Sequence, residues 1–392
     1  MDVKKLVITT AILAAVGSAT VLDGVSGLGL GTNPAFPAIW KSEKRVDAGF
    51  NLLGKTKSDD KVLKDDDSVT VKDLETSLSG FWASYTDSFQ DYWYSVSYSN
   101  ASGALGGTKT TSYTGSDKNT KTSTGLSTEE DTGYGISFAL ARDFAEFGGF
   151  TGGVQLGVNV DGKKTVSQTK PINGKTQELI SKTASDPYLT VALGLVKDID
   201  ASSKVLFGQT LGTRKNVKTL DQEANKAYKD ALGSFDQKDL EDLGYDTEYS
   251  PAETAIGYVY KINDALELGA TYTRNWGAKF NNQRYEDLTV ESLGYNSLGL
   301  AADYLWSEFQ FQGFANFTAG AELAKVDGED IDGDRAKKGT DTTQFGLNAI
   351  WTPSFASIGS VGIGIVNDRA VNWADGTVSD STSTALFYTY LF

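Results

Sequence analysis

The chain of 392 residues contains no cysteine, no histidine, six prolines and one methionine, the first residue. Without cysteine a disulfide framework is excluded. Without histidine, Ser-His and Asp-His catalysis and zinc sites built on histidine or cysteine are excluded. A carboxylate-only active site is the enzymatic alternative that stays open. We predict that the chain is not an enzyme.

Long apolar runs are also missing, so no transmembrane helix is expected. The start of the chain instead has a charged pair, Lys4-Lys5, an apolar stretch at 6–16 and small residues at 17–19, as in a secretory signal peptide. We predict a signal peptide at 1–19; a buried core helix is the alternative. The net charge of −15 argues against binding to nucleic acid or anionic lipid. The protein is expected to be exported, either soluble or as an outer-membrane barrel.

Apolar residues alternate with small or polar ones along most of the chain. At 189–195, for example, aliphatic residues alternate with Thr190, Ala192 and Gly194. This period favours strands whose apolar face contacts lipid and whose other face lines a lumen, rather than a soluble sandwich. Fourteen such segments occur, at 44–54, 74–85, 88–100, 132–144, 148–161, 187–198, 202–214, 249–262, 264–276, 291–305, 307–320, 341–352, 356–368 and 380–392.

The connections between these segments differ regularly in length. Short links, such as 86–87, 145–147, Asn263 and Trp306, alternate with long polar ones, such as 55–73, 101–131 and 162–186. Short turns on one rim and long loops on the other are typical of outer-membrane barrels. We predict an all-β, 14-stranded antiparallel transmembrane barrel over 43–392, with both termini at the short-turn rim.

The last strand ends in alternating Leu386, Tyr388, Tyr390 and Phe392. It resembles the C-terminal recognition signal of bacterial outer-membrane barrels, which implies contact with the assembly machinery through Phe392. An ordinary buried last strand is the alternative.

The inward positions of the predicted strands are mostly small, and their charges are few: Asp47, Lys261, Glu267, Asp303 and Glu308. A general porin needs opposing charged rows at its constriction, and no Arg or Lys ladder is present. We therefore expect a lumen that another segment occupies. Barrel twist and closure are the alternative reason for the glycines.

Two further segments suggest sites. In the predicted external loop 215–248, two capping boxes indicate helices whose apolar residues either pack together or form a capture groove, namely Leu220, Ala224, Leu232, Phe235 and Leu240. At 327–334, Asp330, Asp332 and Asp334 alternate as Ca²⁺ ligands would, but Arg335 stands where the loop needs glycine. A solvated acidic loop is the other interpretation, Ca²⁺ binding stays open, and we predict no metal or cofactor.

Residues 20–42 precede the first predicted strand and are apolar, with two prolines that fix bends. We predict that they form a plug inside the barrel. The G-x-G-T-N-P-A run at Gly29 to Ala35 resembles the N-terminal hatch of the FadL family, outer-membrane transporters of long-chain fatty acids and other hydrophobic compounds. The resemblance implies capture of an apolar ligand outside and its passage as the hatch shifts, with Asn33, Pro34, Ala35, Phe36 and Trp40 as hatch or ligand-binding residues.

The sequence thus predicts a monomeric channel in the outer membrane of a diderm bacterium, in contact with lipid, for passive uptake of hydrophobic small molecules. Fatty acids, hydrocarbons and aromatics all stay open as substrates. The alternatives are a narrow, mildly cation-favouring porin and a structural or assembly barrel.

Overall fold

The computed structural model describes residues 33–35, 38, 44–57, 68–114, 120–144, 146, 148–172, 175–224, 246–277, 279–282, 288–292, 294–320, 323–326, 329–330, 340–353, 359–372 and 377–391, and these are almost entirely β-strand. The predicted signal peptide lies outside them. Among them, no helix has the length and hydrophobicity to cross a membrane.

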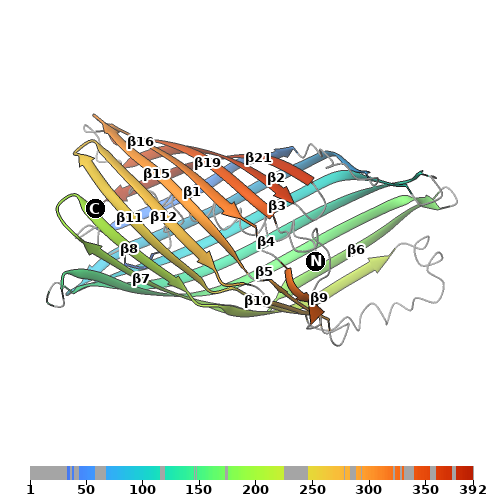
Figure 1. The fold of residues 1–392 in the computed structure, drawn as a ribbon, viewed down its shortest axis with the longest axis horizontal. Helices are drawn as coiled ribbons and strands as arrows, with labels where there is room; N and C mark the ends of the chain where they lie inside the picture. The colour runs from blue at the N-terminus through green and yellow to red at the C-terminus, as the bar shows by residue number, and fades with distance from the viewer. Residues whose placement is uncertain are drawn as a thin grey trace.

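The strands follow one another along the chain as antiparallel neighbours (Figure 1). They are β1 (Arg45–Lys57), β2 (Ser68–Phe89), β3 (Tyr92–Thr114), β4 (Thr120–Phe144), β5 (Phe150–Ile172), β6 (Lys175–Ser185), β7 (Tyr188–Asp198), β8 (Ser203–Thr210), β9 (Thr213–Ala224), β10 (Asp246–Ser250), β11 (Glu253–Asn263), β12 (Leu266–Asn275), β13 (Lys279–Asn282), β14 (Leu288–Ser292), β15 (Tyr295–Trp306), β16 (Phe309–Ala319), β17 (Leu323–Val326), β18 (Glu329–Asp330), β19 (Thr340–Trp351), β20 (Ser360–Asn372) and β21 (Thr377–Leu391).

The sheet closes on itself because the last strand pairs with the first, from Arg45↔Leu391 to Lys57↔Asp380. Six barrel strands are each broken into two halves: β6/β7, β8/β9, β10/β11, β12/β13, β14/β15 and β16/β17. The short β18 pairs only with β17 among the described strands. The result is the closed 14-stranded antiparallel barrel predicted from the alternation.

Every one of the fourteen barrel strands carries at least one large apolar side chain that is exposed on the outer face. On β7, the side chains of Leu193 and Leu195 point outward and are more than two-fifths exposed. That of Val196 points into the lumen and is 4% exposed. Trp276 and Trp306 are exposed at opposite edges of this apolar band, where indole rings sit at membrane interfaces. The outer surface is that of a lipid-facing barrel.

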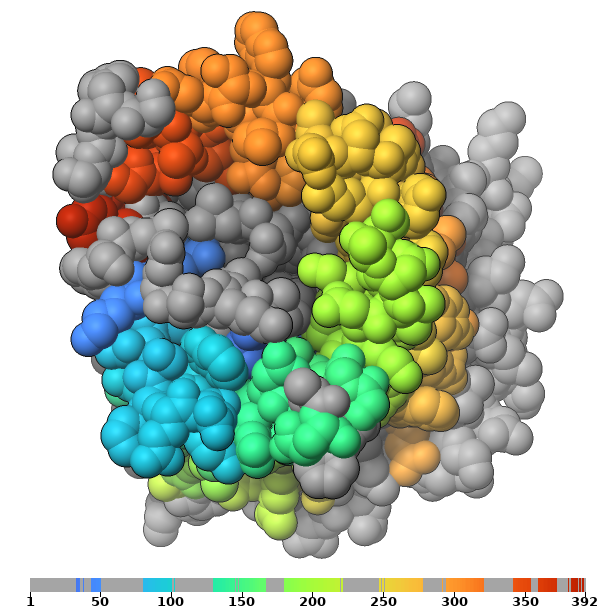
Figure 2. Space-filling model, turned by 90° about the vertical axis from the view of Figure 1, so that its left-hand side faces the viewer, coloured from blue at the N-terminus to red at the C-terminus, as the bar shows by residue number. Residues whose placement is uncertain are grey.

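Seen from the short-turn end, the strands and turns form one ring whose colours follow the chain once around, so that the first and last strands meet (Figure 2). The β2–β3 turn lies a few residues later than the predicted 86–87, at 90–91, and the β15–β16 turn begins one residue after the predicted Trp306. Gln90 and Ser307 adopt left-handed conformations, with φ of 57° and 55°, at the β2–β3 and β15–β16 turns. Residue Asp87, placed by us in a turn, instead lies in β2, where Tyr85 Oη donates a hydrogen bond of 2.7 Å to its carboxylate.

The prediction of long loops at 101–131 and 162–186 is wrong over most of their length, and that at 55–73 is wrong at 55–57 and 68–73, which are strand; 58–67 lie outside the described residues. β3 and β4 stay paired as far as Thr114↔Thr120, and β5 and β6 as far as Ile172↔Lys175. These segments are rich in threonine, which favours strands, and continued pairing satisfies their backbone groups. They lack apolar alternation because the parts of a hairpin beyond the apolar band contact no lipid.

Candidate functional site

The Asn-Pro-Ala turn, residues 33–35, lies against the inner wall of the barrel. Asn33 is 5% exposed, and Ala35 and Ala38 are fully buried. The turn is held internally, since the backbone N–H of Ala35 donates to Asn33 Oδ1 at 3.0 Å and that of Ala38 donates to the Ala35 carbonyl at 3.1 Å. Proline between them restricts φ, so the turn has little conformational freedom.

Two glycines that pair with each other, Gly153 on β5 and Gly194 on β7, form the seat of this turn. A Cβ atom at Gly194 would lie 1.7 Å from Asn33 Oδ1, and one at Gly153 would lie 2.0 Å from the Pro34 carbonyl oxygen. With Asn33 and Pro34 in place, a side chain at either position would force the turn to shift, because the turn approaches the strand backbone directly.

Gly153 and Gly194 belong to a longer row of small inward residues on neighbouring strands. Cross-strand pairing joins Ala141, Gly153, Gly194, Gly208 and Ala255 on β4, β5, β7, β8 and β11. We call this the small-residue row. Because these residues have small side chains or none, they leave room at the inner wall for the Asn-Pro-Ala turn.

In the part of the chain that the structure describes, one polar bond links the turn to the wall. Asn33 Nδ2 donates a hydrogen bond of 3.0 Å to the carbonyl oxygen of Phe207 on β8. A carbonyl oxygen has two lone pairs, so it can accept this bond beside one within the sheet. The Asn33 amide therefore accepts a hydrogen bond within the turn through its oxygen and donates one to the barrel through its nitrogen.

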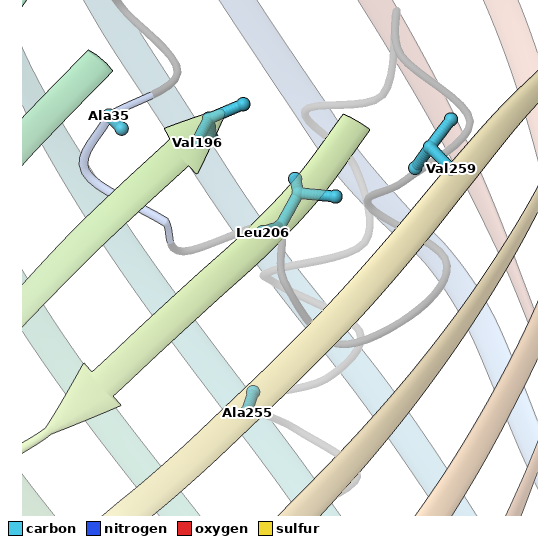
Figure 3. Packing of buried hydrophobic residues seen from close by; sticks show 5 residues of the cluster. All are labelled: Ala35, Val196, Leu206, Ala255 and Val259. Carbon is cyan, nitrogen blue, oxygen red and sulfur yellow. The ribbon is translucent and has the colours of Figure 1, made fainter. Parts of the chain in front are cut away.

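Apolar packing completes the contact (Figure 3). Ala35 belongs to a buried cluster with Val196, Leu206, Ala255 and Val259, which project from β7, β8 and β11. The same three strands carry part of the small-residue row, so the wall beside the turn is apolar.

The inner face of β15, β16 and β19 carries a hydrogen-bonding network beside the buried side chains of Phe314 and Ile350. Asp303 accepts hydrogen bonds from Gln310 Nε2 at 2.6 Å and Gln312 Nε2 at 3.2 Å, and Asn348 Nδ2 donates to Gln312 Oε1 at 3.3 Å. The predicted inward position of Asp303 agrees with this network. The lumen thus contains hydrogen-bonding groups in addition to the apolar cluster beside the turn.

Other charged residues singled out from the sequence are paired. Asp47 is 1% exposed and forms an ion pair with Arg45 at 2.7 Å. Lys261 lies at the short-turn end of β11, where its Nζ is 2.8 Å from Asp264 in the adjacent turn. Its hydrogen bond lowers the pKa of the Asp264 carboxyl. Lys261 therefore does not present a free cation to the middle of the lumen.

The predicted helix after Thr219 is wrong in its described part. Leu220 and Ala224 lie on β9, which pairs with β6 from Ser185↔Val217 to Leu179↔Ala224. Pairing with a long neighbouring strand overrides the local capping signal. Leu232, Phe235 and Leu240 lie outside the described residues, as do Phe36, Trp40, Asp332, Asp334 and Phe392; the capture groove stays a prediction.

The sequence did not single out Gly153 or Phe207. Gly194 was assigned to the lumen by parity, but nothing in a single sequence indicates that its missing side chain makes room for Asn33. Among the described residues no cluster of acidic side chains is arranged to hold a metal ion.

Comparison of the sequence with protein-family models and with curated proteins found no match. Comparison with solved structures did. The barrel is similar to a Pseudomonas aeruginosa FadL homologue (TM-score 0.60, 12% identity, 96% of this chain and 95% of that one). It is also similar to the Ralstonia pickettii toluene transporter TbuX (0.55, 10%, 93% of each) and the Pseudomonas putida toluene transporter TodX (0.53, 10%, 93% of each).

Two of these neighbours are named as transporters and none of the three is named as an enzyme. At such low identity the likeness shows the fold, and it extends over nearly the whole length of both chains. The resemblance drawn from seven N-terminal residues is thereby confirmed by the architecture of the entire chain, which has the fold of the FadL-type barrels.

Proposed function

We propose that the protein is an outer-membrane channel for the passive uptake of hydrophobic small molecules, and that residues 20–42 form its hatch. The observation that carries this proposal is the seating of the Asn-Pro-Ala turn on Gly153 and Gly194 inside the barrel. Because the turn fits only where the wall has glycine at both positions, its contact with the wall is specific. The apolar outer band and the FadL-type fold support the membrane location.

The contacts of the turn are suited to a part that moves. Among the described residues, it is attached to the wall by one amide hydrogen bond and by packing of Ala35 in the cluster with Val196 and its neighbours. A hydrogen bond of this kind contributes about 1 kcal/mol. A ligand that displaces the turn therefore has to break only a few such contacts. It can then pack against the apolar side chains of Val196, Leu206 and Val259.

The setting of the channel follows from the same proposal. Residues 1–19 direct export, the barrel inserts as a monomer in the outer membrane of a diderm bacterium, and Phe392 is read by the assembly machinery. The substrates are hydrophobic compounds such as long-chain fatty acids or hydrocarbons. Two of the similar structures are named as toluene transporters, which supports apolar substrates.

A disulfide that fixes the turn to the wall tests the proposal. A Cβ at position 194 would lie 2.7 Å from Asn33 Cγ, so cysteines at 33 and 194 are within bonding reach. The chain has no other cysteine. In cells producing Asn33→Cys/Gly194→Cys, uptake of the neutral fluorophore N-phenyl-1-naphthylamine should fall to the level of cells without the protein under oxidising conditions. Reductant should restore it, and the single variants should not respond.

Uptake that is unaffected by the disulfide would overturn the role of the turn as a moving hatch. Planar bilayers separate the other functions. The intact protein should show little steady ion conductance, and deletion of residues 20–40 should raise it. Large stable conductance of the intact protein would favour a porin, and absence of both conductance and probe uptake in every variant would favour a structural role.

A further inference from the structure

We propose that the outer surface of the barrel carries a binding site for one phospholipid headgroup, formed by Arg142 and Glu146 at the short-turn rim. The ligand class is a phospholipid whose headgroup has both a phosphate and a primary ammonium, as in phosphatidylethanolamine. The proposal rests on the proposed membrane location. It adds a site outside the barrel, away from the hatch and the lumen.

Arg142 projects from the outer face of β4, close to the end of this strand at Phe144. Phe138 is exposed on the same face, whereas Ala139 and Ala141 on the other face are buried, so even-numbered residues of this stretch point toward lipid. In the proposed orientation the short turns face the periplasm. The guanidinium therefore lies at the edge of the apolar band, at the level of the headgroups of the inner leaflet.

Aromatic rings fix the Arg142 guanidinium at this edge. Its central carbon lies 5.5 Å from the ring centre of Tyr92, the cross-strand neighbour on β3, and 5.3 Å from that of Phe144. Phe144 in turn stacks on Phe150 of β5, with ring centres 5.1 Å apart. The residue opposite Arg142 on β5 is Gly152, which contributes no side chain. Ring faces orient a guanidinium and leave its positive charge in place.

Glu146, in the turn between β4 and β5, places a carboxylate beside this cation. Arg142 Nη2 donates a hydrogen bond of 3.1 Å to Glu146 Oε1, and the two side chains are 31% and 50% exposed. In the part of the chain that the structure describes, Arg142 Nη1 and Glu146 Oε2 have no hydrogen-bond partner. The rim thus presents a cation and an anion side by side, each with an atom still able to bond.

A headgroup with both charges can pair with both side chains at once. Its phosphate accepts hydrogen bonds from Arg142, and its ammonium donates to Glu146. A purely anionic headgroup, as in phosphatidylglycerol, meets the like charge of Glu146. The trimethylammonium of phosphatidylcholine has no N–H to donate. The pair therefore selects phosphatidylethanolamine among phospholipids with the same phosphate.

A second ion pair on the outer face of the same rim lacks this capacity. Lys44 Nζ lies 3.2 Å from Asp87, whose side chain is only 13% exposed. The Asp87 carboxylate also accepts hydrogen bonds from Tyr85 Oη at 2.7 Å and from the backbone N–H of Ser88 at 2.8 Å. Both of its oxygens are occupied by the protein, so this pair is a matched control.

Lipid titration with native mass spectrometry tests the site. The full-length protein is titrated in detergent with phosphatidylethanolamine, phosphatidylglycerol and phosphatidylcholine that have identical acyl chains. We expect the first phosphatidylethanolamine to bind with a dissociation constant about tenfold below those of the other two lipids. Equal affinities would overturn the site and leave the channel function intact. Binding of none of the three would contradict the lipid-facing surface, and with it the proposed membrane location.

Variants of the pair test the cause of the preference. Glu146→Gln, in an exposed turn, should reduce the affinity for phosphatidylethanolamine to that for phosphatidylglycerol, while uptake of N-phenyl-1-naphthylamine stays unchanged. Arg142→Gln should abolish the preference, and Arg142→Lys, which keeps the charge, should retain part of it. Lys44→Gln should keep the full preference. An equal loss in Lys44→Gln, or an unchanged preference in Glu146→Gln, would contradict the proposal.

Discussion

Asn33 Nδ2 donates a hydrogen bond of 3.0 Å to the carbonyl oxygen of Phe207, 174 residues further along the chain. The same side chain accepts the backbone N–H of Ala35 through Oδ1. One amide thus shapes the turn and attaches it to the barrel. An aspartate would supply the acceptor but not the donor, and an alanine neither, which makes this position the most direct to test.

Replacement of Asn33 by alanine should loosen the hatch. Both hydrogen bonds are lost and the Phe207 carbonyl loses a buried partner, at a cost of about 1–3 kcal/mol. This corresponds to roughly a 5- to 150-fold shift from closed toward open. Single-channel recording in planar bilayers should show more frequent or larger openings. Asn316→Ala, which removes a 2.9 Å bond to Gln344 on the other wall, is the control and should stay closed.

Gly194→Ala should displace the Asn-Pro-Ala turn with a single methyl group. Its Cβ would lie 1.7 Å from Asn33 Oδ1, so the turn must move, whereas at Gly313 a Cβ would lie 3.4 Å from Leu347 Cδ2, in ordinary contact. We expect raised conductance and faster entry of a hydrophobic fluorophore for Gly194→Ala and wild-type behaviour for Gly313→Ala. Wild-type conductance of Gly194→Ala would contradict the seating of the turn.

Arg45 and Asp47 form a buried pair beside the β1–β21 seam, with side chains 4% and 2% exposed. Removal of one partner leaves a buried charge and should destabilise the barrel by about 3–5 kcal/mol. Arg45→Met and Asp47→Leu should therefore each lower the urea midpoint of unfolding. The double variant should recover most of this loss; two additive losses would show that the pair is not the unit involved.

The ionised carboxylate of Asp200 makes the stability of one turn depend on pH. The turn joins β7 to β8, and the carboxylate accepts the backbone N–H of Ser202 at 2.7 Å and a hydrogen bond from the Ser203 side chain. These bonds lower the pKa of Asp200. A lowered folded-state pKa means that the stabilisation is complete above the unfolded value, about 3.9, and is lost as pH falls through the folded value.

Hydrogen exchange of residues 199–203 between pH 6 and pH 2 measures this effect. Protection, corrected for intrinsic exchange rates, should decrease below about pH 4 in the wild type. In Asp200→Asn, whose side chain does not titrate, it should be independent of pH over that range. A wild-type profile without a decrease would contradict the role of the carboxylate.

The sequence by itself determined the barrel. Alternation such as that of Leu193 and Leu195 with Gly194 sets which face meets lipid, because successive strand residues point to opposite sides. A wrong register would place apolar residues in the lumen along a whole strand, so the pattern also sets the number and order of strands. Residues 33–35 could be recognised because proline and asparagine mark a turn locally.

Tertiary structure alone decided where strands end and where the turn sits. Thr114, Ile172 and Ala224 continue ladders because a neighbouring strand offers backbone partners there, and polar strands beyond the lipid leave no periodic signal. The seat of Asn33 is likewise invisible in the sequence. The seat consists of Gly153 and Gly194, which have no side chains, and of the carbonyl group of Phe207; the pairing of β5, β7 and β8 brings these three residues together.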